Sequence, residues 1–179
     1  FMFKDLKKII VSEEQINERS KELGKAVTEY YKDKKAPIVV ALLKGSVPFL
    51  ARLIPHLDLD IEIDFMDVKS YEGTESSGDV RILKDLDQSI KGDNILIVED
   101  IIDTGRTLCE VSKLLYNKGA NDIKVVSLLD KPSRRQVDIK ADFVGFEIEN
   151  EFVVGFGLDF NEKYRQLGYV GVLKDELYQ

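Results

Sequence analysis

"NILIVEDIIDTGRTLCEVSKLLYNKGANDIKVVSLLD", residues 94–130, contains two short apolar runs on either side of a segment with helical periodicity. Ile95–Val98 is a continuous aliphatic run and Ile123–Leu129 is mostly aliphatic, and both are rich in β-branched residues, which is typical of strands buried on both faces. Between them Leu108, Val111 and Leu115 recur at helical spacing, and Gly119 follows where a helix end is expected. Strand, helix and strand at this spacing predict a parallel pair joined by a crossover helix, and hence an α/β fold.

The flanking sequence extends this pattern. Ile38–Leu43 predicts another buried strand, and Ser12 with Gln15 predicts a capping box at the start of an N-terminal helix. Apolar and acidic residues alternate over 59–65, so we expect Leu59, Ile61, Ile63 and Phe65 on a buried face and the acidic residues on the opposite face, in a strand that lies near an edge of the sheet or lines an interface. After residue 142 only short strand-like pieces remain, at 143–146, 152–154 and 170–173. The fold class is therefore α/β, with a central, mostly parallel twisted sheet flanked by helices.

Composition excludes several classes of protein. The 179 residues are 44% hydrophobic and 33% charged, and 26 Lys and Arg stand against 33 Asp and Glu, for a formal charge of -7. An acidic protein without a basic stripe has no field to hold a nucleic-acid backbone or an anionic membrane, so we expect neither partner. One cysteine and one histidine exclude internal disulfides and argue against zinc sites, and a cytoplasmic location is expected. The longest uncharged run, 36–43, is too short to span a bilayer.

The segment that follows the strand at 95–98 carries the chemistry. Glu99, Asp100 and Asp103 precede a Thr/Gly-rich turn, Thr104–Thr107, which opens the predicted helix. Backbone N–H groups at such a turn can hold a phosphate. Carboxylates beside it suit sugar hydroxyls, a divalent cation or a proton to be removed. The simplest ligand that would use both the N–H groups and the carboxylates is a phosphorylated sugar with a metal ion.

This string resembles the ribose-phosphate signature of type I phosphoribosyltransferases, and among them the hypoxanthine-guanine phosphoribosyltransferases of purine salvage. Other marks of that family follow in family order: Leu43-Lys44-Gly45, Asp64-Phe65-Met66 with Ser70-Tyr71, Asp130-Lys131-Pro132, and Phe152 to Gly155 continuing through Leu158-Asp159 to Arg165. The resemblance implies one phosphoribosyltransferase domain over residues 1–179, with a small hood formed by the N-terminal segment and the residues after about 142. It implies transfer of the phosphoribosyl group from phosphoribosyl pyrophosphate to a 6-oxopurine, giving IMP or GMP and pyrophosphate.

The resemblance also implies roles for the sugar and phosphate ligands. Ribose and its 5′-phosphate would be bound by Glu99, Asp100, Asp103, Thr104, Gly105, Arg106 and Thr107. Pyrophosphate would be bound by Lys44, Gly45 and Arg165, and family members often have a cis peptide at Leu43-Lys44. The expected cofactor is Mg²⁺, held by Glu99, Asp100 and Asp159.

For the purine, the resemblance implies that Asp103 is the acid/base group, that Phe152 stacks on the ring and that the Val153 backbone bonds its edge. Lys131 would donate to the 6-oxo group, so a 6-amino purine would face it donor to donor and adenine should be a poor substrate. Taken singly, a lysine before Pro132 is typical of a solvated residue, and a phenylalanine in an apolar run is typical of core. A loop from Ser70 and Tyr71 to Asp79 would close over the reacting ribose.

Family members are dimers or tetramers, so we expect a homodimer or homotetramer. Three alternatives stay open: a relative that prefers xanthine, an RNA-binding regulator of the pyrimidine-attenuator type on the same fold, and a phosphosugar-binding module without catalysis.

Overall fold

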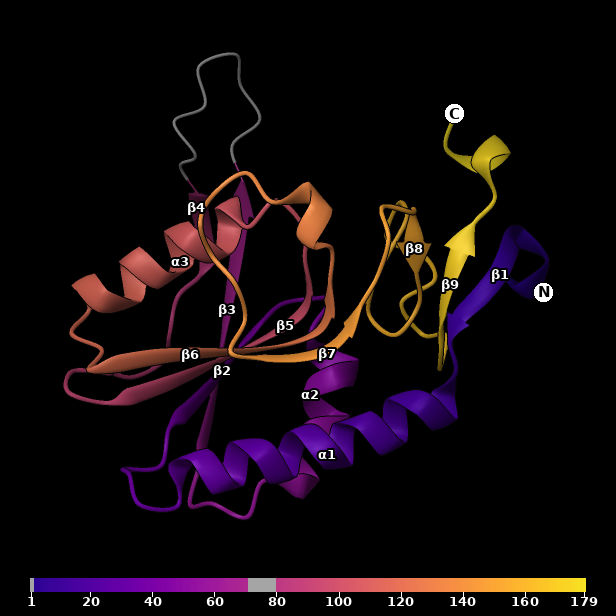
Figure 1. Cartoon of the computed structure of the whole chain (residues 1–179). Coiled ribbons are helices and arrows are strands. Elements are labelled where there is room, and N and C mark those ends of the chain that lie inside the picture. Colours follow the sequence, from indigo (N-terminus) through magenta and orange to yellow (C-terminus); the bar gives the residue numbers. More distant parts are fainter. Residues whose placement is uncertain (1, 71–79) are drawn as a thin grey trace.

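The computed structural model describes residues 2–70 and 80–179. In this part of the chain the main sheet has six strands in the order β4-β3-β2-β5-β6-β7 (Figure 1). Their bounds are β2, Ile38–Leu42; β3, Glu62–Ser70; β4, Val80–Lys84; β5, Asn94–Ile102; β6, Asp122–Asp130; and β7, Phe143–Glu147.

The sheet is mostly parallel, as the sequence predicts. β5 pairs in parallel with β6 on one side, with Ile95 opposite Ile123, and with β2 on the other, with Ile95 opposite Ile38. Helix α3, Arg106–Asn117, connects β5 to β6. Among the strands that the structure describes in this sheet, only β4 runs antiparallel to its neighbour, β3. The α/β fold with flanking helices is confirmed.

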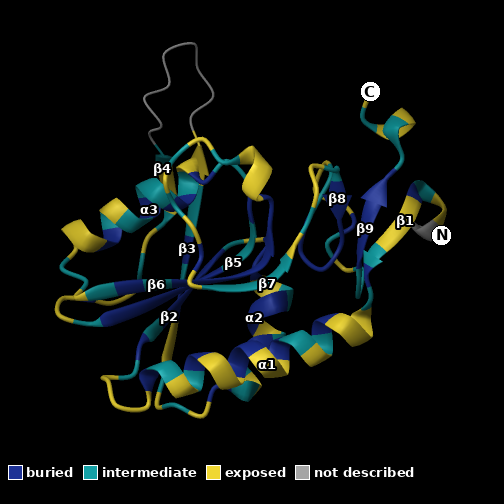
Figure 2. Ribbon diagram, in the orientation of Figure 1, coloured by how far each residue is buried: buried dark blue, intermediate teal, exposed yellow. Residues whose placement is uncertain are grey.

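Helices cover both faces of this sheet (Figures 1 and 2). On one face lie α1, Glu13–Tyr31, and α2, Val47–Leu53, whose apolar side chains pack against Val39, Leu96 and Val126. On the other face α3 packs against Val40, Ile97 and Val125. α1 begins with the predicted capping box, in which the Gln15 N–H donates to Ser12 Oγ at 3.1 Å and the Ser12 N–H donates to Gln15 Oε1 at 2.8 Å. The central strands are therefore buried on both sides, which explains their continuous apolar sequence.

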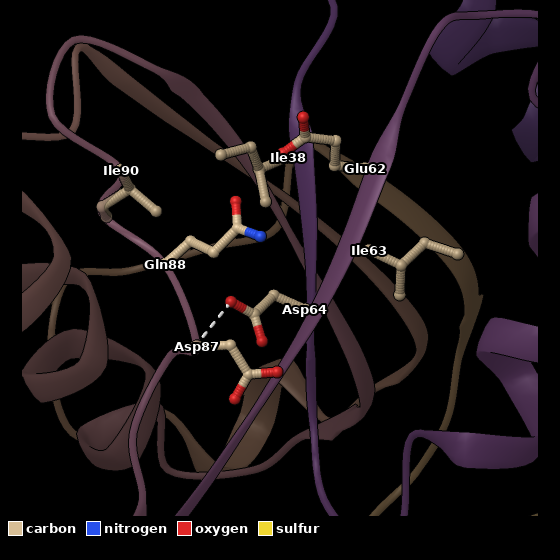
Figure 3. Close-up of a pocket in the computed structure, with 7 residues that line it drawn as sticks. All are labelled: Ile38, Glu62, Ile63, Asp64, Asp87, Gln88 and Ile90. Atoms are coloured by element: carbon tan, nitrogen blue, oxygen red, sulfur yellow. Dashed lines mark hydrogen bonds between the residues drawn. The ribbon is translucent and has the colours of Figure 1, made fainter.

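One prediction about β3 is wrong. Ile63, which was expected on a buried face, is 43% exposed, whereas Asp64, on the acidic face of the same strand, is only 7% exposed. The cause is the connection that precedes β5, which covers the Asp64 side of the strand: the Asp87 N–H donates to Asp64 Oδ2 at 3.0 Å (Figure 3). The Phe65 N–H also donates to Oδ1 at 2.8 Å. Because the carboxylate accepts two backbone hydrogen bonds, its burial is compensated.

A second, three-stranded sheet has the order β1-β9-β8 and is antiparallel throughout. It joins β1, Leu6–Val11, near the start of the described residues, with β8, Val153–Val154, and β9, Val170–Leu173. Figure 1 shows this sheet beyond the carboxyl end of β7. Short 3-10 helices lie at Met2–Asp5, Ile54–His56, Pro132–Arg134 and Asp175–Leu177. Among the described residues, no helix combines the length and apolar character needed to cross a membrane.

Candidate active site

The predicted site residues converge on the carboxyl ends of β2, β5 and β6. Lys44 and Gly45 follow β2, Glu99 to Asp103 form the end of β5 and the turn after it, and Lys131 directly follows β6. Since the three strands are neighbours and parallel, these ends meet at one edge of the sheet. The peptide bond between Leu43 and Lys44 is cis, as the resemblance implies.

Two glycines bring the parts of this edge into contact. A Cβ at Gly45 would overlap the Asp100 Oδ2 atom, and a Cβ at Gly157 would overlap the carbonyl oxygen of Gly45. Gly157 also has φ of +101°, a conformation that side chains rarely adopt. The turn after β2, the carboxylates of β5 and the segment that leads to Arg165 are therefore packed together with no room for side chains between them.

Glu99 and Asp100 lie side by side in the sequence, and both are half-buried. Burial raises the pKa of Glu99 well above its usual value, and the neighbouring charge of Asp100 raises it further. Burial likewise raises the pKa of Asp100, although the Ile101 N–H, which donates to Asp100 Oδ1 at 2.6 Å, and the charge of Arg165 oppose that rise. Half-buried carboxylates with raised pKa values gain from hydroxyl donors or a cation placed beside them.

Asp159, the third expected metal ligand, is near enough for its charge to raise the pKa of Asp100. Nevertheless, no group of three or more His, Cys, Asp or Glu side chains able to hold a metal is formed within residues 2–70 and 80–179. The donor set still suits Mg²⁺, which prefers carboxylate oxygens and usually takes the rest of its ligands from water and substrate phosphates. A cation here would depend on substrate oxygens to complete its coordination.

The turn between β5 and α3 forms a small hollow of about 110 Å³, lined by Ile101, Ile102, Asp103, Thr104, Gly105, Thr107 and Leu108. Gly105 caps α3 with φ of +84° and has no side chain to bond the first-turn N–H groups. The Arg106 N–H donates to Thr104 Oγ1 at 3.3 Å. The first-turn N–H groups and the positive end of this 12-residue helix can bind an anion the size of a phosphate at this turn.

Two arginines that the sequence analysis did not single out hold Asp103. Arg134 Nε donates to the Asp103 carboxylate at 3.0 Å, and Arg135 Nη1 donates to the Asp103 carbonyl oxygen at 2.7 Å. Arg135 is itself fixed by an ion pair with the Asp130 carboxylate and by a bond to the Ile139 carbonyl. The Arg-Arg pair lies four residues beyond Asp130, but nothing in its local pattern indicates which acid it contacts.

Lys131 is buried, at 8% exposed, and is not a solvated lysine. Its backbone N–H donates to the Ile102 carbonyl at 2.9 Å, which anchors it beside the end of β5. Burial lowers the pKa of the Lys131 ammonium; the Asp103 carboxylate opposes this, and the Arg134 guanidinium adds to it. A buried ammonium held between charged neighbours at this edge can serve as a fixed donor.

Phe152 has aromatic partners within the protein. Its ring stacks on Tyr178, with centroids 4.6 Å apart and an interplanar angle of 21°, and meets Phe160 edge-on at 5.6 Å. Next to it, Val153 lies in β8, an edge strand of the small sheet, so one side of its backbone is unpaired within that sheet. Tyr178 is a contact that the sequence analysis missed, because stacking between residues this far apart in the chain leaves no local pattern.

Arg165 and Lys44 are joined by a carboxylate. Lys44 Nζ lies 2.9 Å from Glu162 Oε2, and Arg165 Nη2 lies 3.1 Å from Glu162 Oε1 and 3.5 Å from Asp159 Oδ1. Hydrogen bonds from Lys44 and then from Arg165 lower the pKa of Glu162. Arg165 Nη1 also donates to the Gly157 carbonyl at 2.7 Å. The two cations expected to bind pyrophosphate are thus close together, and Glu162, which the sequence analysis did not name, lies between them.

Ser70 is the last residue of β3, where it pairs with Val80. Tyr71 and the remainder of the predicted closing loop, through Asp79, fall outside the described residues.

A separate cavity of about 320 Å³ lies at the opposite edge of the sheet, where Ile38 and Glu62 begin their strands (Figure 3). The Gln88 side chain points into it in Figure 3. None of the predicted site residues lines this cavity.

Comparison with known proteins agrees with the geometry. Residues 12–161 match the family model of the phosphoribosyl transferase domain. The chain is 58% identical over 176 residues to the hypoxanthine-guanine phosphoribosyltransferase of Lactococcus lactis, covering 98% of this chain and 95% of the relative. It is 53% identical to the Bacillus subtilis protein of the same name, covering 98% of this chain and 97% of that relative. The crystal structure of a hypoxanthine phosphoribosyltransferase from Staphylococcus aureus superposes with a TM-score of 0.95 at 49% identity, covering 99% of this chain and 97% of that one. The chain therefore belongs to the hypoxanthine-guanine phosphoribosyltransferase branch of the phosphoribosyltransferase family.

Proposed function

We propose that this protein is a purine-salvage enzyme, which transfers the 5-phosphoribosyl group from phosphoribosyl pyrophosphate to hypoxanthine or guanine and releases pyrophosphate. One observation carries the proposal: a small hollow at the start of α3, two half-buried carboxylates and the neighbouring cations Lys44 and Arg165 occupy one edge of the sheet. These are the groups needed to bind a sugar with a phosphate at one end and a pyrophosphate at the other. The close relatives named above support the same conclusion.

In this proposal the sugar is held at both ends. The turn at Thr104–Thr107, Arg106 included, binds the 5′-phosphate, and Glu99 and Asp100 accept hydrogen bonds from the ribose hydroxyls. Lys44, the backbone of Gly45 and Arg165 bind the pyrophosphate. Fixing the sugar between two anion sites places its reacting carbon and converts an encounter into a positioned reaction, which supplies a large part of the rate enhancement.

Mg²⁺ would be held by Glu99, Asp100 and Asp159 together with substrate oxygens. When bound, it would neutralise charge on the departing pyrophosphate. The raised pKa values of Glu99 and Asp100 support this assignment, because a cation would relieve the cost of two crowded anions.

The purine is placed by different residues. Lys131 donates to the 6-oxo oxygen, Phe152 stacks on the ring and the Val153 backbone bonds its edge. As a ring nitrogen bonds to the ribose carbon and the bond to pyrophosphate breaks, Asp103 takes the proton from the imidazole ring of the purine. The burial of Lys131 supports its role, since the ammonium cannot turn away to water without unburying its stem.

We also propose that the protein is a homodimer or homotetramer and that a second copy covers the apolar surface formed by α2 and β3. This surface surrounds a hollow of about 600 Å³ lined by Leu43, Val47, Leu50, Ala51, Ile54, Ile63, Phe65 and Lys84. Val47 and Ile63 are 44% and 43% exposed. A contiguous apolar surface of this kind is unfavourable in water and is typical of a protein–protein interface. A cytoplasmic location belongs to the same proposal and rests on the single cysteine.

The decisive experiment compares turnover of hypoxanthine, guanine, xanthine and adenine with phosphoribosyl pyrophosphate and magnesium. We expect hypoxanthine and guanine to be used well and adenine poorly. A preference for xanthine would move the assignment to that class, and a preference for adenine would refute the role of Lys131. No turnover of any base, with salt-sensitive binding of RNA instead, would favour the regulator.

A further inference from the structure

The carboxylate of Glu162 divides its two oxygens between the two cations of the proposed pyrophosphate site. Oε2 lies 2.9 Å from Lys44 Nζ and Oε1 lies 3.1 Å from Arg165 Nη2. Glu162 is at the tip of a turn, with φ of +65°, and its backbone N–H donates to Asp159 Oδ2 at 2.9 Å. Since its side chain is 63% exposed, it can leave this position without disturbing the core.

The Glu162 carboxylate places one oxygen at each of two cations, as two oxygens of a bound phosphate group would. Lys44 has three N–H donors on one nitrogen, and Arg165 has five in a fixed plane, one of which is held by the Gly157 carbonyl. A pyrophosphate group that binds both nitrogens at once must take the position between them that the Glu162 carboxylate occupies, or lie directly beside that carboxylate. The carboxylate and the pyrophosphate therefore compete for the same partners, and like charge adds to the competition.

Arg165 carries an independent sign of a missing acceptor. Its Nε atom is buried and has no hydrogen-bond partner within the described part of the chain, although buried donors are almost always paired. Its Nη1 atom is held by the Gly157 carbonyl at 2.7 Å, so the guanidinium keeps its place when Glu162 leaves. Glu162 thus satisfies the donors of this arginine only in part.

We propose that Glu162 sets the affinity of the site for pyrophosphate and for the pyrophosphate end of phosphoribosyl pyrophosphate, by competing with them for Lys44 and Arg165. It moves aside when the substrate binds and renews its ion pairs as the product leaves, which favours release. This inference rests on the proposed function, because it takes Lys44 and Arg165 as the pyrophosphate ligands.

The test is calorimetric titration of the full chain with pyrophosphate in the presence of Mg²⁺. We expect Glu162→Gln to bind pyrophosphate roughly 2- to 10-fold more tightly than wild type, the range that one or two exposed ion pairs provide. Glu162→Asp keeps the charge and should stay closer to wild type. Glu18→Gln, on the exposed side of α1, changes the net charge equally and should have no effect. In kinetics, the KM for phosphoribosyl pyrophosphate should fall in Glu162→Gln and the KM for hypoxanthine should not.

Unchanged or weaker pyrophosphate binding by Glu162→Gln, in a protein whose wild type binds pyrophosphate and turns over hypoxanthine, would overturn this inference alone. An equal gain in Glu18→Gln would also overturn it, because the effect would then be one of net charge. A wild-type protein that binds no pyrophosphate would refute the proposed function and this inference with it.

Discussion

Replacing Lys131 by methionine separates the function of this side chain from its effect on stability. Methionine has a similar length and fills the same buried space, but it has no donor for a 6-oxo group. A hydrogen bond from a charged donor is worth about 1.5–3 kcal/mol. We therefore expect kcat/KM for hypoxanthine to fall by about 10- to 150-fold. The KM for phosphoribosyl pyrophosphate should stay within about twofold of wild type, since neither the phosphate turn nor the Lys44–Arg165 pair is changed.

The same variant should not be less stable at neutral pH. Burial lowers the pKa of Lys131 in the folded protein below the 10.5 of the unfolded chain. Below that lowered pKa the folded state carries the full cost of a buried ammonium, and the cost disappears as the pH rises from the lowered pKa toward 10.5. The free energy of unfolding of wild type should therefore rise over that pH range, and Lys131→Met should lack this rise while its Tm at pH 7 equals or exceeds that of wild type.

Initial-rate kinetics with hypoxanthine and with adenine, and thermal unfolding at several pH values, measure both effects. Lys25→Met, at an exposed position of α1, is the matched control for loss of one positive charge. Removing the ammonium should also narrow the preference for hypoxanthine over adenine, because the donor-to-donor clash is gone. Full activity with hypoxanthine, or a loss confined to phosphoribosyl pyrophosphate, would refute the assignment of Lys131 to the purine.

Three further variants test the rest of the site and the apolar surface. Asp103→Asn should lower turnover by about 10²- to 10⁴-fold and leave phosphoribosyl pyrophosphate binding intact by calorimetry; unchanged turnover would remove Asp103 from the mechanism. Arg134→Gln should lower turnover by about 2- to 5-fold in wild type. In the Asp103→Asn background, Arg134→Gln should lower turnover no further. If Arg134→Gln lowered turnover equally in wild type and in Asp103→Asn, Arg134 would act on another group. Ile63→Arg should shift the protein toward monomer in sedimentation velocity at micromolar concentration, and an unchanged sedimentation coefficient would mean that a second copy does not cover this surface.

Local pattern was enough to predict the central strands. The middle of each strand is buried on both faces, so Ile95–Val98 is entirely apolar and Ile123–Leu129 is interrupted only by Lys124 and Ser127. Polar residues follow each run, and this change of composition marks both the strand and the site. The capping box at Ser12 was equally local, because both of its hydrogen bonds join residues three apart. The prediction for β3, which also used only local pattern, was wrong about Ile63. Alternation in 59–65 gave two faces but not which of them is covered, and the segment around Asp87 covers the face with Asp64.

Helix α2, Val47–Leu53, was not predicted, because its seven residues are too few to show a helical period. Tertiary contacts with α1 and with Val39 and Ala41 of β2 place it there. Its position gives the apolar surface beside Lys44 that we assign to a second copy.

For the site, the sequence by itself determined which side chains are available and at which strand ends they lie: Glu99, Asp100 and the Thr104–Thr107 turn follow one buried strand, and Lys131 follows the next. Parallel neighbouring strands must end at one edge, so that much follows from chain order. Only the tertiary structure decided the pairing of charges, with Arg134 on Asp103 and Glu162 between Lys44 and Arg165. Ion pairs across the fold depend on where separate loops meet in space, and a sequence records the order of the loops but not the distances between them.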